Sequence, residues 1–169
     1  MNFQKISCQE INGNPFSLIG NDWALLCAGN ESGFNMMTVS WGQVGVLWNK
    51  NVATAYVRPQ RHTRKFCDES DTFTLSFFGE EKREVLKLCG SKSGREIDKM
   101  HLPGLTPAFG NGAVFFEEAK LVLVCRKLYT GKIVPEGFYD SEVSEKNYPA
   151  KDFHIFYTGE ITEVLTKRA

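Results

Sequence analysis

The sequence has no surplus of charge of either sign, because 20 Lys and Arg residues balance 20 Asp and Glu residues. A nucleic-acid-binding domain usually carries a basic surplus, so we expect no nucleic-acid partner. No apolar run is long enough to cross a membrane, and residues 1–5 lead into no signal-peptide-like apolar stretch. We therefore expect a cytoplasmic protein with no membrane partner.

Several motifs of well-known sites are also missing. There is no Gly-x-Ser-x-Gly elbow, which argues against nucleophilic hydrolysis, and no Walker or Gly-x-Gly-x-x-Gly loop for a Rossmann nucleotide site. No Cys-x-x-Cys pair occurs, and three scattered histidines suggest no metal site. The cysteines are odd in number and widely spaced, which favours a reducing compartment over a disulfide framework. They are Cys8, Cys27, Cys67, Cys89 and Cys125.

The chain is long enough for one domain, residues 1–169, with a sizeable core. Hydrophobic residues make up 42% and thirteen residues are Phe, which favours a β-rich protein with a large apolar interior or interface. Short β-like runs recur with only two or three helical segments between them. This pattern predicts a mainly β fold, a closed antiparallel barrel.

The expected strands follow from alternating or continuous apolar runs. A hairpin is expected from residues 23–29 and 35–40, and residues 112–116 and 120–129 are expected to pair with each other. Residues 52–57, 71–78 and 153–167 complete the set, the last broken near Gly159.

Helices are expected at residues 16–20 (a single turn), 63–70 and 80–88. Val85, Leu88 and Cys89 would form the apolar stripe of the third helix, and Gly90 would end it. Residues 91–107 form a polar, glycine-bearing excursion with room for a short helix at 96–100, and such excursions are more often functional than idle. The irregular segment 131–151 is expected to cover an end of the barrel.

The basic stretch after residues 52–57 has the composition of a phosphate site. Arg58 and Arg61 supply guanidinium groups, Pro59 fixes the backbone, and Thr63 has the character of a helix cap. A strand end, cations, a hydroxyl and a helix N-terminus that face one point would hold a phosphate dianion. The alternative is an exposed turn whose arginines are solvated.

The neighbouring strand offers a surface for a planar ligand. Met36, Thr38 and Trp41 would lie along a flat ring, and Ser40 and Gly42 are small groups around the large Trp41 ring. The predicted ligand is thus a flat ring with a phosphate tail. The alternative is that Met36, Thr38 and Ser40 form one face of a strand packed in a core, and for Met36 alone this is the better reading.

Five short motifs, taken in order, resemble the flavin reductase-like family, which includes flavoredoxin. The motifs are Asn35-Met-Met-Thr-Val-Ser-Trp-Gly42, Tyr56-Val-Arg-Pro-Gln-Arg-His-Thr63, Cys89-Gly-Ser-Lys-Ser-Gly-Arg95 with Asp98-Lys99, Gly104-Leu-Thr106 and His154-Ile-Phe-Tyr-Thr-Gly-Glu-Ile161. Each motif is weak alone, but together they cover nearly the whole chain.

The resemblance implies an FMN-binding split β-barrel that forms a homodimer, with the flavin near the subunit interface. His154 would contact nicotinamide or stabilise reduced flavin; the alternative is a histidine satisfied within the sheet. The loop with Ser93, Gly94 and Lys99 would be part of the cofactor pocket, rather than an exposed loop. The full set of predicted cofactor-binding residues is Met37, Thr38, Val39, Ser40, Trp41, Arg58, Pro59, Arg61, His62, Thr63, Cys89, Ser93, Gly94 and Lys99.

Two members of this set depart from the family pattern or have another role open to them. His62 stands where relatives often carry an aromatic residue such as Tyr, and Cys89 is more often a buried small hydrophobe than a redox thiol.

Three functions remain open at this point. The first is an oxidoreductase in which FMN, which carries the redox chemistry, accepts a hydride from NADH or NADPH. The second is a flavoredoxin-like electron carrier that uses a redox protein as donor, without nicotinamide turnover. The third is a barrel without cofactor that serves as an interaction module, which the retained Arg58, Arg61 and Thr63 argue against.

Overall fold

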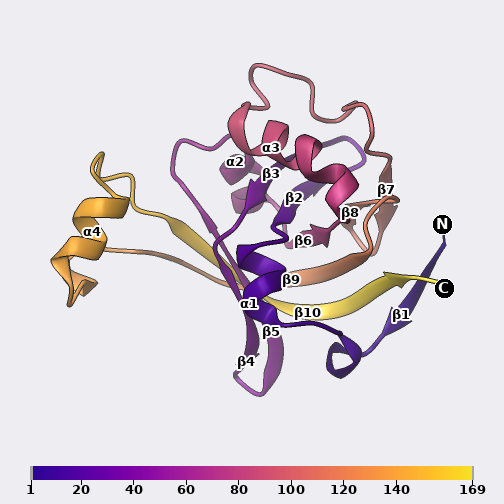
Figure 1. The fold of residues 1–169 in the computed structure, drawn as a ribbon, viewed down its shortest axis with the longest axis horizontal. Coiled ribbons are helices and arrows are strands. Elements are labelled where there is room, and N and C mark those ends of the chain that lie inside the picture. The colour runs from indigo at the N-terminus through magenta and orange to yellow at the C-terminus, as the bar shows by residue number, and fades with distance from the viewer. Residues whose placement is uncertain (1, 169) are drawn as a thin grey trace.

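The computed structural model describes residues 2–168, and most of its strands form one antiparallel sheet (Figure 1). Eight strands make this sheet, in the order β3-β2-β6-β9-β10-β5-β4, with β1 paired to β10. The strands are β1 (Phe3–Ile6), β2 (Ala24–Asn30), β3 (Gly33–Val39), β4 (Gly42–Leu47), β5 (Lys50–Val57), β6 (Thr72–Phe77), β7 (Pro107–Gly110), β8 (Ala113–Phe116), β9 (Leu121–Lys132) and β10 (Ile155–Lys167).

The helices are short. They are α1 (Pro15–Gly20), α2 (Thr63–Glu69), α3 (Arg83–Ser91) and α4 (Ser141–Asn147), with 3-10 turns η1 (Cys8–Glu10), η2 (Glu80–Lys82) and η3 (Pro135–Gly137). The predicted mainly β, antiparallel architecture with a few short helices is therefore confirmed. No helix within residues 2–168 is long and apolar enough to cross a membrane.

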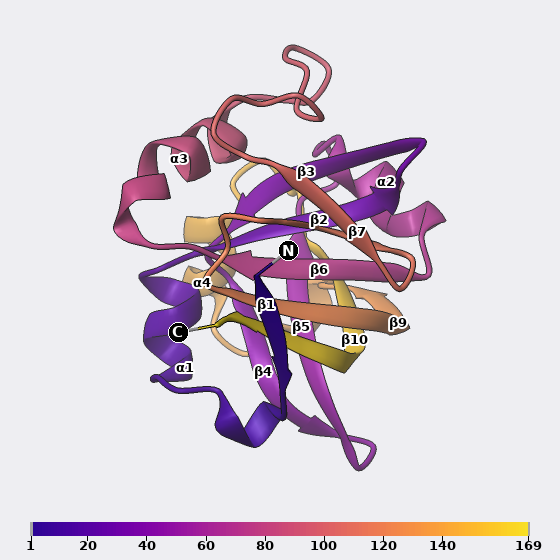
Figure 2. The same cartoon turned by 90° about the vertical axis from the view of Figure 1, so that its right-hand side faces the viewer.

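The sheet curves strongly but is not closed by hydrogen bonds. In Figure 2, β2, β6 and β9 run nearly crosswise to β4 and β5. The end strands β3 and β4 do not pair with each other in the part of the chain that the structure describes. The expectation of a fully closed barrel is thus wrong in this detail.

Alternating side chains of the sheet fill two separate cores, because successive residues of a strand point to opposite faces. In β2, Leu26 belongs to a core inside the curve of the sheet with Val57 and Tyr157. Its neighbour Leu25 belongs to a second core, beneath α3 and the β7-β8 hairpin. Both leucines are fully buried.

The predicted β2-β3 hairpin is confirmed, but a second hairpin was not anticipated. β4 pairs with β5, and the turn between them places Trp48 and Asn49 at φ of 53° and 56°. Two successive positive φ angles are typical of a type I′ hairpin turn. Most of β4 is exposed, so it lacks the buried alternation that would reveal it in the sequence.

The expected pairing of the strands near 112–116 and 120–129 is wrong. β8 pairs instead with β7, and β9 lies between β6 and β10. β7 and β8 form a hairpin of consecutive strands, whereas β9 pairs with strands more distant in the sequence. The expected break of the last strand near Gly159 is absent: β10 is continuous, and its pairing with β9 only shifts register between Thr158 and Gly159.

The two central helices differ in detail from the prediction. α2 begins at Thr63, but its N-cap is His62 and not Thr63. α3 continues through Gly90 to Ser91, and its buried residues are Leu86 and Cys89, whereas Leu88 is exposed. The expected short helix at 96–100 is absent: these residues form turns and bends.

Residues 133–154, which we call the arm, link β9 to β10 and carry η3 and α4. Figure 1 shows the arm projecting from the ends of these strands, with α4 well away from the rest of the sheet. The expectation that this segment covers an end of the barrel is therefore wrong. The end of α4 and the residues after it return to the sheet, where Asn147 and Asp152 contact Arg58.

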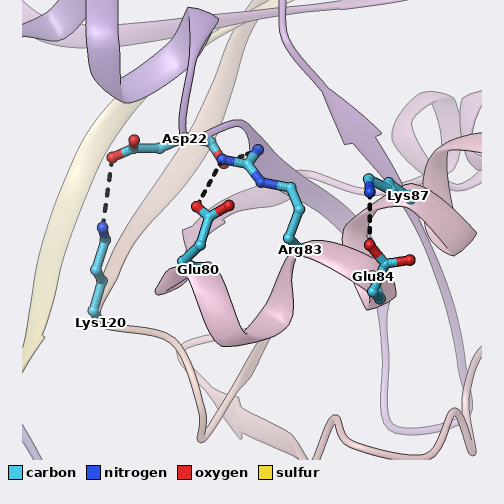
Figure 3. Close-up of polar contacts among 6 residues, drawn as sticks. All are labelled: Asp22, Glu80, Arg83, Glu84, Lys87 and Lys120. Atoms are coloured by element: carbon cyan, nitrogen blue, oxygen red, sulfur yellow. Dashed lines mark hydrogen bonds and ion pairs between the residues drawn. The ribbon is translucent and has the colours of Figure 1, made fainter.

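Surface ion pairs connect the start of β2, α3 and β9 (Figure 3). Lys120 lies 3.5 Å from Asp22, and Arg83 contacts both Glu80 and the Asp22 carbonyl at 3.2 Å. Glu84 and Lys87 pair along α3. Exposed pairs of this kind contribute about 0–1 kcal/mol each, so they add little to the stability provided by the two cores.

Candidate functional site

Three chain segments meet where β3 ends, β5 ends and β10 begins. Ile155 lies opposite Val57 in the antiparallel register, so Arg58 and His154 follow as the next pair across the two strands. The end of β3 completes a cavity of about 240 Å³, which we call the strand-end cavity. Its lining residues are Met37, Thr38, Val39, Ser40, Trp41, Tyr56, Arg58, Arg61 and His154.

The β3 side of the cavity combines fixed and accessible groups. The Thr38 hydroxyl donates to the Leu86 carbonyl at 2.5 Å, which holds β3 against α3. Trp41 is 44% exposed, and its ring lies 5.0 Å from the His154 ring. Met36 is fully buried in the second core, so it does not line the cavity.

Arg58 lines the cavity but is engaged by the base of the arm. Its guanidinium lies 2.6 Å from Asp152 and donates to the Asn147 carbonyl at 3.0 Å. It also lies over the Tyr148 ring, 5.3 Å from the centroid. Gln60 donates to the same Asp152 carboxylate at 2.9 Å, and these partners hold the Asp152 pKa below its usual value.

Arg61 lines the same cavity without a carboxylate partner in the described chain. One of its guanidinium nitrogens donates to the Gly90 carbonyl at 2.6 Å, near the end of α3. Burial, and then the nearby Arg58 charge, lower the Arg61 pKa from its ordinary value. Its positive charge is therefore the least neutralised one at the cavity.

His154 is buried at the start of β10, among aromatic rings. The Tyr148 hydroxyl lies 2.9 Å from His154 Nδ1, and the Tyr56 ring meets the imidazole edge-on. Burial lowers the His154 pKa to about 4, with further lowering by Arg58 and Arg61 against an opposing effect of Asp152. The imidazole is therefore neutral at pH 7.

The remaining predicted residues do not line the strand-end cavity. Most of them belong to what we call the inner cluster, behind β3. Its members are Asn35, His62, Thr63, Cys89, Gly94 and Lys99.

In one half of the inner cluster, a buried amide and a glycine fix the turn into α2. Asn35 donates to the hydroxyl of Thr63 at 2.8 Å, and both side chains are buried. A Cβ built on Gly94 would lie 2.2 Å from Asn35 Oδ1 and 3.0 Å from His62 Cδ2. Only glycine permits this close approach of the 91–107 loop.

His62 Nδ1 is buried without a hydrogen-bond partner in the described chain. Burial, and then the charges of Arg95, Lys65 and Lys99, lower the His62 pKa. Three cations therefore make the region around His62 positive.

In the other half, Lys99 is 4% exposed and its ammonium donates to the carbonyls of Met36 and Cys89 at 3.0 and 2.8 Å. Burial lowers the Lys99 pKa and raises that of the Cys89 thiol. Lys99 thus joins β3 to the end of α3. The Cys89 thiol is buried, as expected for a small hydrophobe.

Pro59 and Ser93 lie outside both groups. Pro59 is half-buried, two residues after the end of β5. The Ser93 hydroxyl accepts a bond from the Arg95 amide at 3.2 Å within the loop after α3. Their predicted roles toward a cofactor stay predictions.

The structure adds residues that sequence reasoning did not select. Tyr56 alternates with Arg58 on one face of β5, a period-two signal that was available in the sequence. Asn35 begins the first of the quoted motifs. Tyr148 and Asp152 lie in a segment of irregular composition, and no sequence signal indicates that they contact Arg58.

Trp41 also borders two further cavities. One, of about 450 Å³, lies against the arm and is lined mainly by apolar groups such as Val134, Phe138 and Tyr148. The other, of about 460 Å³, lies against α1. A planar molecule larger than the strand-end cavity would therefore find adjoining space on either side of Trp41.

Comparisons with known proteins place these features in context. A family model described as "Flavin reductase like domain" matches residues 16–169. A comparison with curated proteins gives no match.

Among solved structures, flavoredoxin from Methanosarcina acetivorans is 22% identical, with 87% of this chain and 69% of that chain covered at a TM-score of 0.70. An FMN-binding protein from Thermus thermophilus is 18% identical, with 95% and 80% covered and a TM-score of 0.67. An NADH:FAD oxidoreductase from Streptomyces globisporus is 13% identical, with 86% and 81% covered and a TM-score of 0.63. At these identities the likeness concerns the fold.

Proposed function

Because this chain belongs to the flavin reductase like domain family, we propose that it is an FMN-binding oxidoreductase with NADH or NADPH as electron donor. The observation that carries the proposal is the convergence of β3, Arg61 and His154 on one cavity. These groups come from three distant parts of the chain. Among the described residues, they bring hydrogen-bond donors, an aromatic ring and a cation without a carboxylate partner to the same cavity.

The charge of the residues present is compatible with FMN, and the adjoining cavities beside Trp41 add space to the strand-end cavity. The ring would lie along Val39, Ser40 and Trp41, whose backbone and side chains border the cavity. The phosphate would lie beside Arg61, toward the positive region around His62, because a dianion is stabilised by guanidinium donors and nearby cations. When bound, FMN supplies the hydride and electron transfer that no side chain here provides.

His154 would act at the accessible side of the ring. As a neutral imidazole it holds one proton, and the Tyr148 hydroxyl at Nδ1 fixes the ring orientation. If Tyr148 donates this bond, the proton is on Nε2, so His154 is a hydrogen-bond donor toward the nicotinamide or the flavin.

A flavoredoxin-like carrier function is the alternative, in which the bound FMN relays electrons between redox proteins. The structural likeness to the Methanosarcina acetivorans flavoredoxin favours it. In both functions the protein holds the ring and sets its reduction potential. The two differ only in the electron donor.

Anaerobic mixing of the FMN-loaded protein with NADH and NADPH distinguishes these functions. Rapid loss of flavin absorbance is the expected result for the reductase. Absence of this loss, together with bleaching by a reduced ferredoxin-type protein, would support the carrier. A protein that takes up no added FMN would contradict both and would leave an interaction module.

We further propose a cytoplasmic homodimer in which residues 1–169 form one domain. Trp41, Val134 and Val143 are exposed apolar side chains around the cavities, and Tyr139 is fully exposed on the arm. A second copy would remove this apolar surface from water. All five cysteines are unpaired, in keeping with a reducing compartment. Light scattering of the eluted protein, with a dimer expected and a monomer contradicting it, tests the assembly.

A further inference from the structure

The two arginines of the strand-end cavity, three residues apart, have different partners. Arg58 is bound to Asp152 and Asn147 at the base of the arm, whereas Arg61 donates to a carbonyl of α3. Both line the cavity, and the sequence predicts that both bind a phosphate. Their contacts instead indicate different roles.

The contacts of Arg58 pair its charge with a carboxylate and occupy two of its nitrogens. A guanidinium has a planar fork of donors, and here one side meets a carboxylate at 2.6 Å and another nitrogen meets a carbonyl at 3.0 Å. Asp152 also accepts from Gln60. A phosphate dianion at Arg58 would have to compete with a carboxylate already in contact with it.

The segment that Arg58 holds is the one that orients His154. Tyr148, beneath the guanidinium, stacks on Phe153 at 4.8 Å and contacts His154 Nδ1 through its hydroxyl. The His154 carbonyl accepts a bond from the Ile133 amide on the other side of the arm. Arg58 thus connects to His154 through Tyr148.

We propose that Arg58 is a positioning residue that, with Asp152, anchors residues 147–154 and so orients His154 toward the strand-end cavity. The phosphate of the flavin is then bound by Arg61 and not by Arg58. This inference rests on the proposed function where it concerns FMN. The anchoring itself concerns only contacts within the chain.

The test uses a matched pair of substitutions, Arg58→Lys and Arg61→Lys. Lysine keeps the charge but has one nitrogen in place of the planar fork, so it cannot reproduce the contacts that two separate guanidinium nitrogens make with Asp152 and Asn147. Two quantities are measured in each variant: the dissociation constant for FMN, by flavin fluorescence, and the titration midpoint of His154, by NMR of the FMN-free protein. The variant His154→Gln identifies the His154 signal.

We expect Arg58→Lys to raise the His154 midpoint by about one unit, because a loosened segment admits water to the imidazole. We expect the dissociation constant for FMN to change by less than about threefold in this variant. Arg61→Lys should weaken FMN binding about tenfold and leave the His154 midpoint in place.

Two results would overturn the inference: FMN binding that is weakened equally in both variants, or a His154 midpoint that does not move in Arg58→Lys. If the wild-type protein binds no FMN, the proposed function fails, but the His154 midpoint still decides the anchoring. Should Arg58→Lys fail to fold, Asp152→Asn leaves the arginine intact. It should accelerate amide exchange in residues 147–154 with unchanged FMN affinity; unchanged exchange would contradict the anchoring.

Discussion

The strand-end cavity and the inner cluster lie on either side of the end of β3 and use similar residue types in different ways. In the inner cluster, Asn35 and Lys99 are buried and donate to groups of the protein itself. In the strand-end cavity, Trp41 and Arg61 border open space. Polar groups that satisfy one another maintain the fold, whereas groups that face a cavity remain available to a ligand.

This difference divides the predicted cofactor-binding residues into two sets with distinct expected phenotypes. Substitutions in the inner cluster should reduce stability first. Substitutions in the strand-end cavity should reduce ligand binding first.

Gly94→Ala should have the largest effect on stability. The new Cβ would overlap Asn35 Oδ1 at 2.2 Å and break the Asn35–Thr63 hydrogen bond. We expect the free energy of unfolding to fall by about 3 kcal/mol in urea denaturation. Gly33→Ala is the matched control, because a Cβ there meets nothing within 4 Å. Equal effects of the two substitutions would contradict the close packing of the inner cluster.

The pH dependence of stability should report on His154. The unfolded chain binds a proton at this residue below about pH 6.5, and the folded chain only below about pH 4. The stability that the neutral, buried imidazole contributes is therefore complete above pH 6.5 and is lost as the pH falls toward 4, by at most about 3 kcal/mol. Urea denaturation across this range measures it.

His154→Gln should flatten this slope, while the same change at exposed His101 should not. An unaltered slope in His154→Gln would show that the imidazole is not held in a low-pKa environment. Such a result would remove the basis for a neutral hydrogen-bond donor at the cavity.

Lys99→Met should reduce the free energy of unfolding by about 2 kcal/mol. The two carbonyls that the ammonium contacts would lose a buried donor, and each such loss costs about 1–3 kcal/mol, offset in part by removal of a buried charge. Lys65→Met, at an exposed position of α2, is the control. If Lys99→Met weakens FMN binding without loss of stability, Lys99 acts on the ligand and the comparison fails.

Trp41→Ala should show the opposite pattern, with the smallest change in stability. The ring is partly exposed and lies beside three cavities, so its loss should weaken FMN binding about tenfold. Thermal unfolding should change little. A large loss of stability with unchanged FMN affinity would place Trp41 with the inner cluster.

The sequence predicts local features of this site well. The end of the strand at Ser40-Trp41 and the cations after Val57 follow from residue pattern, and the structure brings Trp41, Arg58 and Arg61 to one cavity. Period-two alternation also predicts most buried strands, because one face of each must meet a core.

What the sequence could not give is the set of contacts between distant segments. Asp152 reaches Arg58 only because β5 and β10 pair in a particular register, and no local signal sets that register. Likewise, the sequence places Lys99 in a cofactor pocket or, as the alternative, on an exposed loop, and only the packing of the 91–107 loop against β3 shows that it is buried. The missed pairing of β7 with β8 has another cause, because this hairpin turns at Asn111-Gly112, a local signal that the sequence does contain.

A crystal structure of the protein soaked with FMN tests the central claim most directly. The account predicts isoalloxazine density along Val39, Ser40 and Trp41, with the phosphate beside Arg61. Density for FMN elsewhere, or a strand-end cavity that stays empty while Arg61 turns toward solvent, would contradict it.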